Sequence, residues 1–456
     1  MQDLTRGPIF GHLIKLAAPI AIGMLFQTMY VLVDLYFVAR LGDAAIAGVA
    51  TAGNLQFIVM ALTQVLGVGT MALIAQAVGR KDQADANLIY NQSLLLALVC
   101  GIGVLAGGYA LAQPYARTLG ADAVTAAAGV TYLYWFLPGM ALQFALVAMG
   151  SALRGTGIAK PGMVVQVLTV LLNAVLAPVL IAGWLTGHPF GIAGAGLATS
   201  ISIGVGVILM FLYFHRLEHY VGWNPALFRL RPEVCRRILR IGLPPGGEFV
   251  MLFLFLAVIY AVIRPFGAAA QAGFGIGSRL NQAIFLPAMA VAFAVAPLAG
   301  QNFGARRLDR VRDTFRAAAI IGSSVMMALT LLCQWKPQWL MHAFTSDPVV
   351  VAIGSGYLLI SSWNFVAQCI IFSCSGMFQA FGRTLPSLYA SAVRLVVFAV
   401  PVLWLSTRSG FELDDVWRLV LLTVTMQMCV SVWLLKRALL REQAVLAETP
   451  RRWVHV

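Results

Sequence analysis

LLLALVCGIGVLAGGYALA, residues 94–112, decides the fold class of this chain. The run contains no Asp, Glu, Lys or Arg, and a helix of this length can cross about 30 Å of hydrocarbon at about 1.5 Å per residue. Residues 282–305 and 317–335 are uncharged in the same way. Strands of a β-barrel would be shorter and would alternate between apolar and polar side chains. The pattern therefore predicts membrane-spanning α-helices.

The composition of the whole chain agrees with lipid as its solvent. Hydrophobic residues make up 60% of the 456 positions, charged residues 11%, and the mean hydropathy is +0.86. Soluble chains are about 45–50% apolar and about 25% charged. We expect an all-α membrane protein with twelve transmembrane helices, near residues 14–38, 46–78, 88–112, 126–151, 162–185, 193–214, 241–263, 270–302, 317–335, 350–380, 387–406 and 419–440.

The basic residues predict the orientation of these helices. With a cytoplasmic N-terminus, 23 of the 31 Lys and Arg residues fall in inner loops and tails. The positive-inside rule then places the chain in a cell (inner) membrane as a multi-pass protein with both termini in the cytoplasm. This distribution also accounts for the net charge of +14, so we expect no nucleic-acid partner. The expected partners are the lipid bilayer and a small-molecule substrate, with the protein a monomer.

The two halves of the chain repeat each other at a constant offset of 225 residues. The matches include Lys15 with Arg240, Pro19 with Pro244, Gly42 with Gly267, Gly157 with Gly382 and Pro161 with Pro386. Six helices per half is an even number, so both halves enter the membrane in the same direction. We expect two six-helix lobes related by a parallel internal repeat, which is a transporter architecture that works by alternating access. Their boundaries are residues 1–214, a cytoplasmic linker at 215–240, and 241–456 with a short cytoplasmic tail.

No enzyme signature is present. The six cysteines have no metal-ligand spacing, and no catalytic constellation of His, Asp or metal-binding residues falls inside the spans. We therefore expect neither catalytic residues, nor a metal site, nor a cofactor.

Several short motifs are spread along the chain. They are K-L-A-A-P at 15–19, Gln27, Asp34, R-L-G at 40–42, A-Q-A-V-G-R at 75–80, R-G-T-G-I-A-K-P at 154–161, Asn173 followed by Pro178, and G-I-A-G-A-G-L-A-T at 191–199. Together they resemble the multidrug and toxic compound extrusion (MATE) transporters over nearly the whole chain. The resemblance implies a twelve-helix antiporter that expels amphipathic, usually cationic, compounds against a proton or sodium gradient.

Only Asp34 and Glu248, of the 17 acidic residues, fall inside predicted spans. Charged groups in hydrocarbon are costly, so both are candidate functional residues. Asp34 lies about 28 Å along a helix from Lys15, hence in the outer half of the first span. Tyr30 and Gln27 precede it by four and seven positions, so the same helix face would line a substrate cavity. The alternative is a residue at a fraying helix end.

Asp34 is expected to couple transport to the ion gradient. Its ionised form would accept a cation, and protonation from outside would remove the charge and release the substrate. The resemblance implies that Asn173 and Thr199 work with this aspartate, although ordinary helix–helix hydrogen bonding is an alternative for both. One branch of the family has a second aspartate where this chain has Ala177. Because sodium prefers several oxygen ligands, we expect a proton as the coupling ion, with sodium as the alternative.

The second half contains Glu248, Arg279 and Arg394 at depths that could reach a common level. Buried charges usually pair, so a structural ion pair is one reading. The other reading is substrate contact, which would add Glu248 and Arg279 to the cavity. An unpaired arginine would suit an anionic group, and a lipid-linked precursor flippase of the same superfamily remains an alternative function.

Overall fold

A computed structural model of the protein describes residues 1–119, 122–184, 187–408 and 410–448. Some side chains inside its helices lie outside this description, namely those of Val31, Leu32, Asp34, Leu35, Asp43, Ala44, Thr51, Asn54, Leu119 and residues 446–448. The coupling candidate Asp34 is among them.

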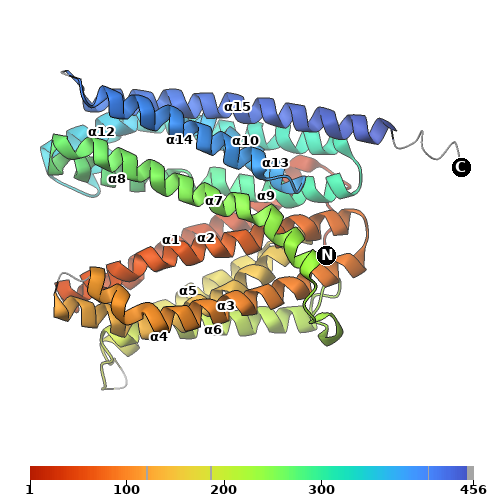
Figure 1. Ribbon diagram of the computed structural model, residues 1–456, viewed down its shortest axis with the longest axis horizontal. Coiled ribbons are helices and arrows are strands. Elements are labelled where there is room, and N and C mark those ends of the chain that lie inside the picture. Colours follow the sequence, from red (N-terminus) through yellow and green to blue (C-terminus); the bar gives the residue numbers. More distant parts are fainter. Residues whose placement is uncertain (120–121, 185–186, 409, 449–456) are drawn as a thin grey trace, which may run out of the picture. The chain divides into compact units, whose positions relative to one another are not determined.

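Helices account for nearly all of the described chain (Figure 1). Short 3-10 turns occur at Pro225–Leu227 and Arg264–Phe266. The α-helices are α1 (Ile9–Ala39), α2 (Asp43–Gly79), α3 (Gln83–Leu119), α4 (Ala123–Gly155), α5 (Lys160–Ile181), α6 (Ile192–Arg216), α7 (Pro232–Ile263), α8 (Ala268–Ile284), α9 (Leu286–Gly304), α10 (Leu308–Trp335), α11 (Pro337–His342), α12 (Pro348–Ser361), α13 (Asn364–Ala380), α14 (Leu385–Leu405) and α15 (Leu413–Glu448).

The number of spans agrees with the sequence. In the described part of the chain, 11 helices are long and apolar enough to cross a membrane, and the bent pair α12 and α13 would make a twelfth. The predicted all-α membrane fold is therefore confirmed. Two predicted helices, 270–302 and 350–380, are each broken in two. Phe285 separates α8 from α9, which has Pro287 in its first turn, and α12 meets α13 at an angle of 55°.

The internal repeat extends to the backbone conformation of the turns. Gly42 and Gly267, 225 residues apart, precede α2 and α8 with φ values of 100° and 91°. Lys81 and Arg306 share the same offset and are the described non-glycine residues with positive φ, at 62° and 58°. L-residues seldom adopt this conformation. Its recurrence at equivalent places indicates that both halves use the same turns.

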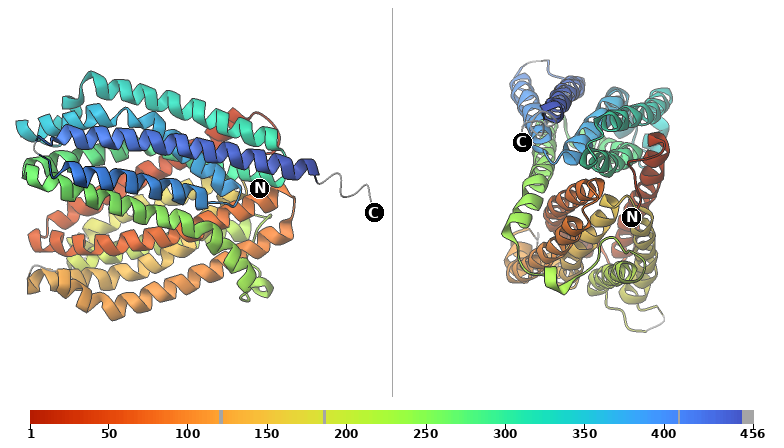
Figure 2. Two further views of the ribbon diagram at one scale, coloured as in Figure 1. Left: turned by 45° about the horizontal axis from the view of Figure 1, so that its top comes forward. Right: turned by 90° about the vertical axis from the view of Figure 1, so that its right-hand side faces the viewer.

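The chain divides into two compact units. Unit 1 contains Met1–Asp3 and Ala18–Leu243, and unit 2 contains Leu4–Ala17 and Pro244–Val456. Both divisions within a helix fall beside a proline, Pro19 in α1 and Pro244 in α7. Proline removes one backbone hydrogen bond and bends a helix. Within each unit the long helices run alongside one another (Figure 2).

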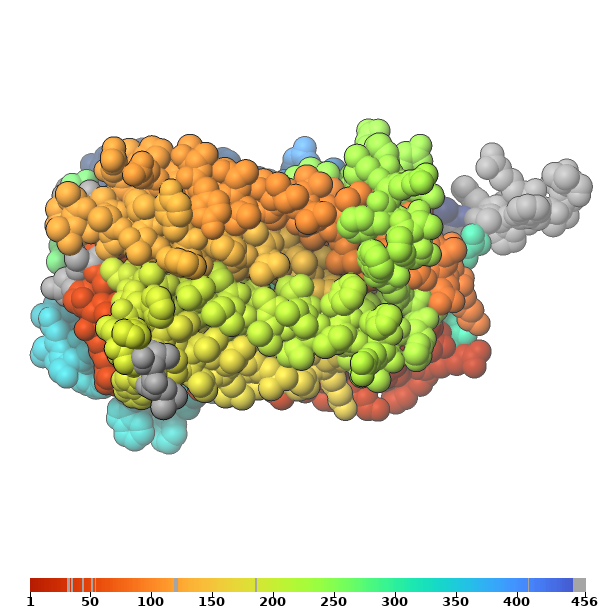
Figure 3. Space-filling model, turned by 90° about the horizontal axis from the view of Figure 1, so that it is seen from below, coloured from red at the N-terminus to blue at the C-terminus, as the bar shows by residue number. Residues whose placement is uncertain are grey.

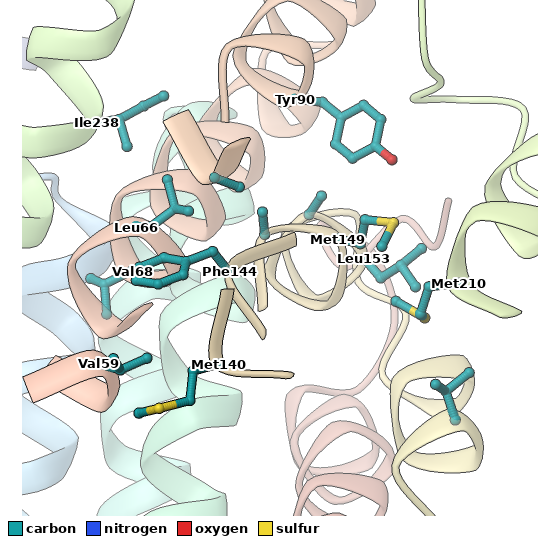
Figure 4. Packing of buried hydrophobic residues seen from close by; sticks show 14 of the residues in the cluster. Val59, Leu66, Val68, Tyr90, Met140, Phe144, Met149, Leu153, Met210 and Ile238 are labelled. Atoms are coloured by element: carbon teal, nitrogen blue, oxygen red, sulfur yellow. The ribbon is translucent and has the colours of Figure 1, made fainter. Parts of the chain in front are cut away.

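The core of unit 1 joins α2, α3, α4, α6 and the first turns of α7. Phe144, Leu66 and Ile238 are buried in it and lie in the cluster of Figure 4. Gly242 of α7 packs so tightly on the backbone of Val65 that a Cβ atom would have no space there. In unit 2, the rings of Phe274 and Trp417 stack with centroids 5.4 Å apart.

The segment between α6 and α7 is held to unit 1 by side-chain amides of α3. Asn91 donates to the carbonyl of Gly222 at 3.0 Å and accepts from the amide of Asn224 at 2.9 Å. Gln92 donates to the carbonyls of Leu227 and Arg229 at 2.9 and 2.7 Å. This segment lies along one end of unit 1 in Figure 3. The linker is therefore an ordered part of the unit.

Candidate functional site

A hydrogen bond in unit 1 joins two residues of the predicted site. The hydroxyl oxygens of Tyr30, on α1, and Thr199, on α6, are 2.6 Å apart. The Thr199 hydroxyl also lies within donating distance, 3.2 Å, of the carbonyl of Ala195 on its own helix. Thr199 is 1% exposed and Tyr30 is half-buried. The side chain of Tyr30 thus fixes one face of α1 against the interior of α6.

Asn173 places an amide in the interior of α5. The residue is 0% exposed, and neither its oxygen nor its nitrogen has a hydrogen-bond partner among the described residues. Helix α5 packs against α6, which carries Thr199. A buried polar group without a partner lowers the free energy of unfolding by about 1–3 kcal/mol. Stabilisation of the fold therefore does not explain why an amide is present at this position.

The remaining predicted residues of unit 1 lie on α1 and α5. The backbone of Asp34 belongs to α1, one turn after Tyr30, while its side chain is outside the described part. Gln27, one turn before Tyr30, is exposed. Ala177 is 0% exposed and follows Asn173 by one turn on α5. The interior surface of α5 therefore offers an amide and a methyl group, without a carboxylate, at these two positions.

Glu248, on α7 in unit 2, is half-buried, and its Oε1 atom has no hydrogen-bond partner in the described ranges. No ion pair within 4.0 Å joins it to Arg279 or Arg394, all three of which are described, so the structural ion pair expected from the sequence is not formed. Arg279 is exposed on α8.

Helix spacing explains why Glu248 and Arg394 stay apart. The Arg394 guanidinium lies 4.2 Å from the centroid of the Phe255 ring and donates to Gln427 at 3.2 Å. Phe255 comes seven residues after Glu248, or about 10 Å along the helix. The carboxylate is thus about two turns of α7 away from the level of the guanidinium.

Sequence reasoning missed a polar group at the junction of α8 and α12. The amide of Asn281 donates to the hydroxyl of Tyr357 at 2.8 Å and to that of Ser361 at 3.2 Å. The Oδ1 atom of Asn281 is buried without a partner in the described structure. Only the position of Asn281 within a predicted span, two residues after Arg279, could have indicated this group.

The chemistry available at these sites is hydrogen bonding and charge recognition. Across the described residues, no group of three or more His, Cys, Asp and Glu side chains could hold a metal ion. Buried amides and hydroxyls can bind a proton donor, a small cation or a polar group of an organic molecule. This arrangement suits reversible binding.

Comparisons with known proteins identify the family of the chain. The MatE family model matches residues 19–179 and 246–405, once in each half. The probable multidrug resistance protein YoeA of Bacillus subtilis (strain 168) is 24% identical over 428 residues, which are 91% of both chains. The multidrug export protein MepA of Staphylococcus aureus (strain MRSA252) is 25% identical over 443 residues, 96% of this chain and 95% of that one.

Solved structures share the fold. A MATE protein in the bent conformation has a TM-score of 0.91 at 24% identity, with 97% of this chain and 98% of that chain covered. A MOP superfamily transporter from Pyrococcus furiosus has a TM-score of 0.89 at 24% identity, with the same coverage of both chains. Because the family model covers most of both halves, the chain belongs to the MatE family, the multidrug and toxic compound extrusion transporters, and is a multi-pass membrane protein and not an enzyme.

Proposed function

We propose that this protein is a secondary active antiporter that exports amphipathic, cationic small organic compounds in exchange for protons. Membership of the multidrug efflux family supports transport of this kind. The observation that carries the coupling site is the Tyr30–Thr199 hydrogen bond, which packs the Asp34-bearing helix against α6. The partnerless amide of Asn173 on the neighbouring helix provides a further polar group.

The proton is the proposed coupling ion because the oxygen ligands suited to sodium are few on α5. Ala177 supplies a methyl group one turn after Asn173. A sodium ion would have to rely on neutral oxygens and on Asp34, whereas a proton needs only the carboxylate. A coupling carboxylate that binds either a proton or the substrate cation would link the two by competition.

The proposed substrate contacts are Gln27 and Tyr30 in unit 1, and Glu248 and Arg279 in unit 2. Glu248 supports a cationic substrate because no basic side chain in the described structure neutralises it. The exposed side chains of Gln27 and Arg279 are available to a ligand. The protein would work as a monomer by alternating access, in which one six-helix lobe, 1–214, rocks against the other, 241–456, with the linker at 215–240 between them.

The proposed location is the cell inner membrane with both termini in the cytoplasm. The arginines of the linker and of residues 306–316 support this orientation. A phosphatase fusion after Arg229 should report cytoplasm, and one after Arg117 should report the outer side. If both fusions report the same side, the orientation is wrong.

Proteoliposomes test the coupling ion. Ethidium, a monovalent amphipathic cation, should be transported under an imposed pH difference and not under a sodium gradient at equal pH. Asp34→Asn should abolish this transport. Asp122→Asn is the matched control, because Asp122 caps α4 outside the span by accepting from the amide of Thr125, and asparagine is an equally good cap. Transport driven by sodium alone would overturn proton coupling.

A further inference from the structure

A groove of about 170 Å³ lies in unit 2 between α10 and α15, and none of the residues proposed for coupling or substrate binding lines it. Its walls are largely apolar and include Phe315 of α10 and Leu435 and Leu439 of α15. Arg312 and Lys436, one from each helix, complete the lining. The groove thus combines an apolar channel with two cationic groups.

The packing of the helices explains the groove. Helices α10 and α15 each pack against α13, whereas direct contact between the two is sparse. A gap therefore remains between α10 and α15, where both helices pack against α13. Leu435 is 2% exposed and Leu439 is 9% exposed, while Leu440 at the edge is 53% exposed. The floor of the groove is therefore inside the unit, and its edge faces the surroundings, which are lipid for a multi-pass membrane protein.

The two cations have no acidic partner in the part of the chain that the structure describes. The nearby acids are engaged elsewhere or do not reach them. Asp313 lies 3.7 Å from Arg316, and Glu442 lies 3.0 Å from Arg383. Asp309 forms no ion pair with either cation among the described residues. Two like charges beside one groove repel each other unless an anion lies between them.

We propose that this groove binds an anionic phospholipid. Its phosphate would lie between Arg312 and Lys436, and one acyl chain would follow Phe315, Leu435 and Leu439 towards the membrane interior. The apolar channel favours a lipid over free phosphate, which would leave the leucines uncovered. The groove lies near the arginine-rich start of α10, the end proposed to face the cytoplasm, where the leaflet carries anionic lipids.

Native mass spectrometry of the full chain in detergent tests this site. Phosphatidylglycerol should remain bound, and phosphatidylcholine of the same acyl composition should not. The double variant Arg312→Gln with Lys436→Gln should bind phosphatidylglycerol about thirtyfold more weakly, the effect expected for two basic groups at an anionic headgroup. Arg312→Lys, which keeps the charge, should retain binding.

Arg316→Gln is the matched control. Arg316 lies one turn after Arg312 on the same helix, its side chain is 74% exposed, and it pairs with Asp313. The Arg316→Gln substitution should change the affinity for phosphatidylglycerol less than twofold. An equal loss in Arg316→Gln would indicate diffuse surface charge and overturn the site. Equal retention of phosphatidylcholine, or displacement of the lipid by millimolar inorganic phosphate, would overturn it as well.

Discussion

The hydroxyls of Tyr30 on α1 and Thr199 on α6 share a hydrogen bond across 2.6 Å. Tyr30 and Thr199 are 169 positions apart in the sequence, so only the fold brings them together. Through this bond, the helix that carries Asp34 is tied to the interior of unit 1. A change in the proton or substrate bound at Asp34 could thereby alter how α1 packs.

Replacing Tyr30 tests this connection. Tyr30→Phe should lower stability by about 0.5–1.5 kcal/mol, the usual net contribution of a hydrogen bond, and should also reduce ethidium export. Thr199→Val should have a similar effect, and the double variant should lose less than the sum of the two. Thermal unfolding in detergent measures the first effect and proteoliposome flux the second.

Tyr36→Phe is the control for this pair. Tyr36 lies on the same helix, is 55% exposed, and accepts a hydrogen bond from Arg40 at the surface. Removal of the Tyr36 hydroxyl should leave the stability of the protein and ethidium export nearly unchanged. Strictly additive effects of Tyr30→Phe and Thr199→Val would show that the two hydroxyls act independently.

Asn173→Leu should raise the stability of the protein and lower its export activity. Leucine has a similar size and removes two buried polar atoms that have no partner in the described structure, which should stabilise the fold by about 1–3 kcal/mol. If Asn173 contacts the coupling ion or substrate, transport should fall at the same time. The thermal midpoint and the initial rate of export are the two measurements.

Asn91→Leu is the comparison for Asn173→Leu. Asn91 is also 0% exposed, but it bonds Gly222 and Asn224 of the linker. The same substitution there should destabilise the protein. A loss of stability in both variants would mean that Asn173 has a structural partner and would weaken its assignment to the site.

The sequence predicted the membrane spans better than the side-chain contacts between helices. Hydropathy identifies an apolar helix, but it cannot locate the break at Phe285, because apolar residues continue on both sides of it. The face shared by Tyr30 and Gln27 followed from helical spacing. The contact with Thr199 depended on the resemblance, because spacing within one helix carries no information about its neighbour.

In the second half of the chain, the sequence did not predict which charged side chains pair. Charge pairing between Glu248 and Arg394 was a reasonable expectation from depth alone. Depth along a span was too coarse to predict it, since the guanidinium packs on Phe255, two turns from Glu248 along α7. The packing of the linker against α3 could not be predicted from the sequence either, because amides such as that of Gln92 could equally have faced other helices. Side-chain partners across helices require the three-dimensional packing.

Glu248→Gln should leave the stability of the protein nearly unchanged. Breaking a buried ion pair costs about 3–5 kcal/mol, but no such pair exists here among the described residues. Export of a cationic substrate should nevertheless fall, and that of a neutral one should change less, because the carboxylate is proposed to face the cavity. Thermal unfolding and parallel flux assays separate the two effects.

Arg394→Gln provides the contrast to Glu248→Gln. It removes the stacking on Phe255 and the hydrogen bond to Gln427 at 3.2 Å, so it should destabilise the protein by about 1–2 kcal/mol. A drop of several kcal/mol in Glu248→Gln that a second change at Arg394 restores would show that the two residues pair in another conformation.

The voltage dependence of export tests whether Asp34 is the only coupling carboxylate. One carboxylate exchanges one proton, so export of a monovalent cation for one proton moves no net charge. A pH difference should then drive ethidium export by about 1.4 kcal/mol per unit, while a potassium diffusion potential at equal pH should drive none. A neutral substrate would differ, because each 100 mV would add about 2.3 kcal/mol. Ethidium export in response to voltage alone would mean that more than one proton is exchanged per cation. Export that persists in Asp34→Asn would mean that the coupling site lies elsewhere, with Glu248 the next candidate.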